Sequence, residues 1–196
     1  MSIWGWLLLG AGTWVLAVIL KVLADFIVQR TTGANLHDWL AATLSGLWSS
    51  LCELGLAALA FWYWSASFAD ALVLALGAAF AEFVILLIGA AGANFQKPQA
   101  KAKAAATWNA FFAERAVAFA SHMASRALMW LGIGGTAGLP AVGSAFGLFA
   151  VTEAIQAYGQ AKEWDWLNAR ILWSYLLFQI VIIAGQVVLL IWWWGI

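Results

Sequence analysis

Six long apolar stretches, separated by short polar ones, run along the 196-residue chain. Each has the roughly 20 mostly apolar residues that a helix needs to cross about 30 Å of hydrocarbon. The strict alternation of apolar and polar residues that is typical of a transmembrane strand is missing from them. The pattern predicts an all-α, integral membrane bundle of six transmembrane helices in a single domain (1–196), with helices at about 3–28, 39–64, 68–92, 106–134, 141–159 and 167–194.

Composition supports a membrane protein and narrows its partners. Hydrophobic residues make up 65% of the chain and charged residues 9%, whereas soluble domains have about 45–50% and about 25%. Nine basic residues balance nine acidic ones, so the chain lacks the basic face that a nucleic-acid partner requires. We therefore expect the lipid bilayer, and no nucleic acid, as a partner. The chain has no nucleotide-binding glycine motif and no zinc-type cysteine cluster, so no soluble cofactor is expected.

Lysine and arginine are distributed unevenly between the two ends of the predicted helices. The loops after the first, third and fifth helices carry six of these residues, and the other loops and both termini carry none. Cytoplasmic loops are enriched in lysine and arginine, so both termini are predicted to be non-cytoplasmic. Most of the 15 tryptophans fall near predicted helix ends, which is typical of residues that anchor helices at the lipid headgroups.

The main clue to function is a set of ionisable residues at membrane depth. Each of the four central helices has a glutamate near its midpoint, and the fourth also has three basic residues; the set is Glu53, Glu82, Glu114, Glu153, Arg115, His122 and Arg126. A spacing of seven places Arg115 and His122 on one helix face. Ionisable groups usually face the interior of a membrane bundle. We therefore predict a buried polar network in which Arg115 and Arg126 neutralise two of the carboxylates.

Three further patterns predict local contacts. Lys21 and Asp25, four residues apart, are predicted to pair on the first helix. Gln179 and Gln186 on the sixth helix are predicted to form interhelical hydrogen bonds. The stretch 143–147, with glycine at both ends, has the small-residue spacing of a helix contact face.

Three of these glutamates lie in short motifs. They are Glu53 in Cys-Glu-Leu-Gly, Glu82 at the end of Gly-Ala-Ala-Phe-Ala-Glu, and Glu114-Arg115 followed by His122. Over roughly 48–159, this pattern resembles bacterial intramembrane peptidase-like proteins of the CAAX-protease/YhfC type. That family is multi-helical and has glutamates and histidines on four core helices. The resemblance implies a bacterial inner (cytoplasmic) membrane, and it implies catalysis by Glu114 and His122 with help from Glu53 and Glu82.

The sequence departs from the family pattern at three places. Ala57 replaces an arginine, Ala79 and Phe80 stand where a histidine is common, and the fifth helix has no histidine. A catalytic water needs a general base and a second group that polarises the carbonyl. We therefore expect a non-catalytic accessory or scaffold subunit of a larger membrane complex, that is, a pseudoenzyme.

Three alternatives stay open at this point. The first is an active glutamate- and histidine-dependent intramembrane peptidase. The second is a pigment- or haem-binding subunit with His122 as its single axial ligand, since neutral imidazole binds such metals and Ala118, one turn earlier, leaves room for a flat ring. The third is transport of protons or a small cation by the midplane carboxylates.

Overall fold

The structure is a computed structural model that describes residues 1–32, 38–94, 101–135, 137–165 and 168–195. Its side chains are described over 1–24, 39–89, 108–135, 137–165 and 168–195. These residues form six helices: α1 (Ile3–Thr32), α2 (Asp38–Trp64), α3 (Phe68–Asn94), α4 (Lys101–Ile133), α5 (Gly138–Ala161) and α6 (Ala169–Trp194).

The predicted all-α bundle of six helices is confirmed, and most boundaries differ by only a few residues. Five of the helices are long and apolar enough to cross a membrane. The exception, α4, is long enough but carries the charged residues that lower its hydropathy. It also begins at Lys101 rather than near 106, because the intervening alanines and lysine are strong helix formers.

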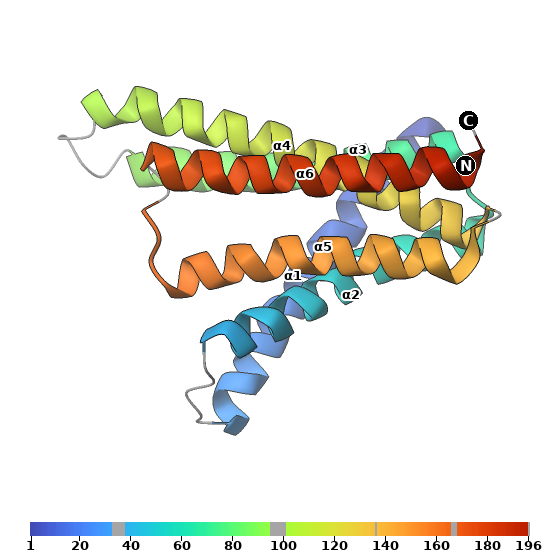
Figure 1. Ribbon diagram of the computed structural model, residues 1–196, viewed down its shortest axis with the longest axis horizontal. Coiled ribbons are helices and arrows are strands. Elements are labelled where there is room, and N and C mark those ends of the chain that lie inside the picture. The colour runs from blue at the N-terminus through green and yellow to red at the C-terminus, as the bar shows by residue number, and fades with distance from the viewer. Residues whose placement is uncertain (33–37, 95–100, 136, 166–167, 196) are drawn as a thin grey trace.

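In Figure 1, α3, α4, α5 and α6 run roughly along the long axis of the molecule, and α1 and α2 run obliquely to them. The most extensive contacts are those of α2 with α5 and of α1 with α3, while α4 touches α2, α3, α5 and α6. Both termini lie at the same end of the bundle (Figure 1). The least apolar helix is therefore one that packs against four of the others.

Glycines allow two of these helix pairs to pack backbone against backbone. A Cβ atom at Gly10 of α1 would lie 2.0 Å from the carbonyl oxygen of Leu74, and one at Gly77 of α3 would lie 2.0 Å from that of Leu7. In the α2–α5 pair, a Cβ atom at Gly46 would lie 2.4 Å from a carbonyl oxygen of α5. Small residues permit this close approach, which maximises van der Waals contact between membrane helices.

The turn between α2 and α3 is held by side-chain hydrogen bonds. Ser65 has a positive φ of 48°, and Ser67 and Asp70 each accept a hydrogen bond from the other's backbone N–H. This reciprocal pair is a capping box, which satisfies backbone donors that a helix start leaves free. Trp130 of α4 donates its indole N–H to the carbonyl oxygen of Ala66 at 2.7 Å, so this turn is also tied to α4.

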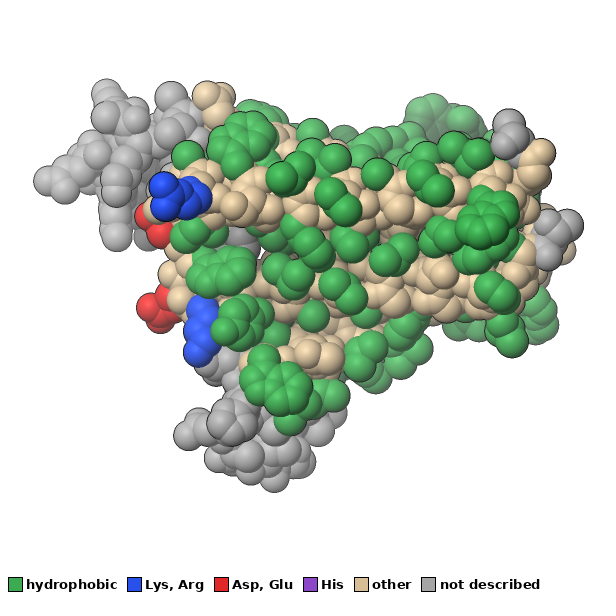
Figure 2. All heavy atoms as spheres, in the orientation of Figure 1, with side chains coloured by type: hydrophobic (Ala, Val, Ile, Leu, Met, Phe, Trp, Pro, Cys, Tyr) green, Lys and Arg blue, Asp and Glu red, His purple; other side chains and the backbone are tan. Residues whose placement is uncertain are grey.

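The apolar core lies toward the end of the bundle that holds the termini. It includes Trp6 of α1, Leu74 of α3, Leu128 of α4 and Phe149 of α5, all of them buried. In the view of Figure 2, apolar side chains are spread along the whole length of the surface and the charged side chains lie near its left end, as expected for a protein that contacts lipid. The charged residues are placed farther along the helices, past this core.

The close contact between α1 and α3 leads to a first testable prediction about stability. Gly77→Ala places a methyl group against the α1 backbone and should lower the free energy of unfolding by about 1–3 kcal/mol, the usual cost of overpacking. Thermal unfolding in mild detergent measures this change. Gly12→Ala is the matched control, because a Cβ atom there meets nothing within 4 Å. Equal melting temperatures for the two variants would contradict the prediction.

Candidate functional site

Charged and polar side chains from five helices converge into one connected cluster, here called the charged network. All seven residues singled out from the sequence belong to it, and the structure adds Lys21 and Ser49. The network thus comprises Lys21 of α1, Ser49 and Glu53 of α2, Glu82 of α3, Glu114, Arg115, His122 and Arg126 of α4, and Glu153 of α5. Each of these helices is held to at least one other through an ion pair or a hydrogen bond.

Glu53 links three helices through its two carboxylate oxygens. Lys21 Nζ of α1 lies 2.5 Å from Oε1, and Arg126 Nη2 of α4 lies 3.3 Å from Oε2. The side chains of Glu53 and Arg126 are only 3% and 1% exposed. Buried charges are tolerated when they are paired and hydrogen-bonded, and Glu53 provides this pairing for two cations.

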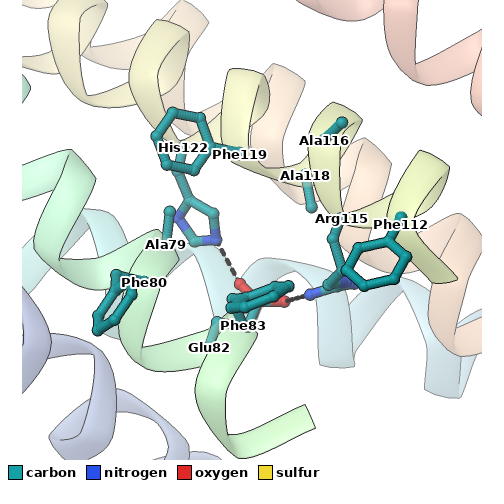
Figure 3. A pocket seen from close by; sticks show the side chains of 10 residues that line it. All are labelled: Ala79, Phe80, Glu82, Phe83, Phe112, Arg115, Ala116, Ala118, Phe119 and His122. Carbon is teal, nitrogen blue, oxygen red and sulfur yellow. Dashed lines mark hydrogen bonds and ion pairs between the residues drawn. The ribbon is translucent and has the colours of Figure 1, made fainter. Parts of the chain in front are cut away.

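Glu82 occupies the equivalent position between α3 and α4. Its Oε1 accepts a hydrogen bond from Arg115 Nη1 at 2.5 Å, and its Oε2 lies 2.5 Å from His122 Nε2 (Figure 3). Arg115 also donates its Nε and Nη2 hydrogens to its neighbour Glu114. One arginine therefore serves two carboxylates, Glu82 and Glu114.

His122 contacts other residues of the network through both of its ring nitrogens. Its Nδ1 lies 2.5 Å from Arg126 Nη1, and a guanidinium group can only donate hydrogen bonds. Nδ1 is therefore the acceptor, and Nε2 carries the hydrogen that is donated to Glu82. Both ring nitrogens of His122 are thereby engaged. Axial ligation of a pigment or haem, which stays a prediction, requires one of these two contacts to break.

Glu153 and Lys21 complete the network on the side of α5. Glu153 Oε2 accepts a hydrogen bond from Ser49 Oγ at 2.5 Å and lies 3.5 Å from Lys21 Nζ. Lys21, predicted to pair with Asp25, has its ammonium group between Glu53 and Glu153. The Asp25 side chain lies outside the described residues, so the pair of Lys21 with Asp25 stays a prediction. The overlooked signal is that Lys21 is the one lysine inside a predicted helix.

A pocket of about 480 Å³ opens between α3 and α4, beside the charged network. Four phenylalanines contribute its aromatic lining, and three network residues contribute its polar part; these are Phe80, Phe83, Phe112, Phe119, Glu82, Arg115 and His122 (Figure 3). Ala118, expected to leave space next to His122, also lines this pocket. Its volume falls within the range of small-molecule sites, about 300–1,000 Å³.

The two glutamines of α6, Gln179 and Gln186, are predicted to form interhelical hydrogen bonds. Both are buried, and Gln186 is 0% exposed. Within the described part of the chain, neither amide atom of Gln186 nor the side-chain oxygen of Gln179 has a hydrogen-bond partner. The predicted interhelical hydrogen bond of Gln186 is therefore wrong for these residues. The spacing of seven correctly placed both glutamines on an inward face, but facing inward does not guarantee a partner.

Comparison of the chain with protein-family models, curated proteins and solved structures gives no match. The resemblance to intramembrane peptidase-like proteins therefore stays a prediction from the sequence.

The different surroundings of Glu53 and Glu114 lead to a second testable prediction. Glu53→Gln leaves buried Arg126 and Lys21 without their close carboxylate and should lower the free energy of unfolding by about 3–5 kcal/mol, as breaking a buried ion pair does. Glu114→Gln should cost less, because Arg115 keeps its contact with Glu82. Denaturation of both variants in the same detergent measures the difference. The reverse order of stabilities would contradict this account of the network.

Proposed function

We propose that this chain is a non-catalytic, multi-pass membrane protein that acts as an accessory or scaffold subunit of a larger membrane complex. We place it in the bacterial inner (cytoplasmic) membrane, with both termini on the non-cytoplasmic side, as the distribution of lysine and arginine predicts. The observation that carries the proposal is that the groups able to activate water are already engaged with other side chains of the network.

General base catalysis needs an acceptor atom within hydrogen-bond reach of the water it activates. In His122 the acceptor is Nδ1, and the Arg126 guanidinium occupies it at 2.5 Å. Glu53 contacts two cationic side chains, and Glu82 contacts Arg115 and the His122 N–H. This arrangement supports a structural role, in which the charges hold five helices together.

Ala57 stands where the intramembrane peptidase-like proteins have an arginine, and its surroundings support the same proposal. Ala57 lies in the apolar core and is fully buried, so no cationic side chain extends from that point of α2. Ala79 and Phe80, which stand where the family often has a histidine, line the pocket without contributing an acid or a base. A second group that would polarise a carbonyl is thus missing from both positions.

The outer face of α5 is a further observation in favour of a partner subunit. Gly143 and Gly147 are exposed, and a Cβ atom at either would meet nothing within 4 Å. Within the described part of this chain, the two glycines of the predicted contact stretch therefore have no neighbouring helix against them. Small residues four apart allow two membrane helices to pack closely, so this face is suited to a transmembrane helix of another subunit.

Purification from native membranes in mild detergent tests the proposed function. We expect a stoichiometric set of membrane proteins to co-elute, and the double variant Gly143→Leu/Gly147→Leu should lose them while melting like the parent, since both sites are exposed. Gly12→Leu on the outer surface of α1 is the control that should keep the partners. A solitary species from native membranes, or partners retained by the double variant, would contradict this docking face.

An active intramembrane peptidase is the second candidate, favoured by one observation. Glu82 and His122 form a close acid–base pair in the wall of a pocket, and Glu114 joins them through Arg115. If this reading holds, Glu114→Gln should abolish cleavage of a co-reconstituted transmembrane reporter that the parent protein cleaves. The control is Glu163→Gln, placed after α5. Undiminished cleavage by the Glu114→Gln variant, or no cleavage by the parent protein, would contradict the peptidase hypothesis.

A further inference from the structure

The pocket between α3 and α4 opens onto the outer surface of the bundle. Phe80, Phe112 and Phe119 line it and are 57%, 50% and 39% exposed, so these rings form its rim (Figure 3). Ala79 also lines it and is buried, so this residue belongs to its inner wall. Apolar side chains on the outer surface of a membrane bundle contact lipid. The pocket is therefore open to the hydrocarbon of the bilayer.

The three polar side chains in the pocket wall are already engaged with the charged network. The two carboxylate oxygens of Glu82 lie 2.5 Å from Arg115 Nη1 and 2.5 Å from His122 Nε2 (Figure 3). The other two guanidinium nitrogens of Arg115 contact Glu114, and His122 Nδ1 contacts Arg126. The surface that the pocket presents is accordingly almost entirely apolar. A polar ligand would have to break a contact of the network, whereas an apolar ligand leaves all of these contacts in place.

The pocket extends along α4 over the depth of one leaflet. Its lining residues on this helix run from Phe112 to His122, a stretch that rises about 15 Å at about 1.5 Å per residue. This length is about half of the roughly 30 Å hydrocarbon thickness of a bilayer. Trp108, one turn before Phe112, stacks on its ring with 5.9 Å between the ring centroids. Because tryptophan favours the headgroup level, the pocket begins just below the headgroups and ends near the bilayer centre.

We propose that this pocket binds one acyl chain of a phospholipid from the leaflet at the start of α4. The chain lies along α4 between the phenylalanine rings, and the headgroup stays at the level of Trp108. Space for the chain comes from small side chains in the lining, those of Ala79, Ala116 and Ala118. A chain in this space gains the dispersion contacts that an empty apolar pocket lacks. This binding site goes beyond the proposed scaffold role and does not depend on it.

Native mass spectrometry of the full-length, delipidated protein in mild detergent tests the proposal. Titration with dioleoylphosphatidylcholine should show one lipid that binds at a lower concentration than all further lipids. Dihexanoylphosphatidylcholine has the same headgroup, but its chains are too short to extend from Trp108 to His122. We expect it to bind much more weakly at the first site, because less apolar surface is buried.

Two variants fill the pocket, and a third is their matched control. Ala116→Leu and Ala118→Leu each place a larger side chain in the space of the acyl chain. Each should weaken binding of the first lipid about tenfold or more, because about two buried methylene groups already correspond to a tenfold change in affinity. Ala184→Leu makes the same substitution at an exposed position of α6, outside the pocket, and should bind the first lipid like the parent protein.

Several results would overturn the proposal. These are a first lipid that binds no more tightly than the later ones, equal binding of the short-chain lipid, or full affinity in both folded pocket variants. An equal loss of affinity in Ala184→Leu would also contradict it. Elution volume and melting temperature show which variants are folded. If Ala118→Leu fails to fold, Ala116→Leu decides the outcome, because Ala116 is exposed and tolerates a larger side chain.

Discussion

Keeping charge away from lipid is the constraint on which the rest of this bundle depends. Glu53 meets it most fully, because its two oxygens compensate a lysine from α1 and an arginine from α4. An unpaired charge at this depth would cost several kcal/mol, so the three helices must keep the register that joins these groups. The apolar core alone does not impose such a register, since lipid tails are as apolar as its side chains.

The same constraint explains the position of α4. This helix has the lowest hydropathy of the six and carries four residues of the charged network. It is also the helix that touches α2, α3, α5 and α6. Neighbours on several sides supply the partners that its polar side chains cannot find in lipid. The glycine contacts of α1 with α3 and of α2 with α5 complete the arrangement, because they bring the backbones close enough for side chains of five helices to meet.

The charged network has two halves, one centred on Glu53 and one on Glu82. Around Glu53, a lysine and an arginine from different helices meet one carboxylate, which suits a structural role. Around Glu82, one arginine contacts two glutamates beside an aromatic pocket. His122 lies between the two halves and contacts both through its ring nitrogens. This arrangement joins five helices and leaves Gly143 and Gly147 on the exposed face of α5.

The sequence by itself determined the six helices, their approximate ends and the inward face of α4, because hydropathy and helical periodicity are local properties of the chain. It also indicated which residues would be buried as a polar cluster. Only the tertiary structure decided the pairing. The match of Lys21 with Glu53, the single arginine shared by Glu82 and Glu114, and the unpaired amide of Gln186 depend on how the helices are rotated and shifted against one another. Contacts between backbones, such as that at Gly77, set these rotations, and no spacing within a single helix encodes them.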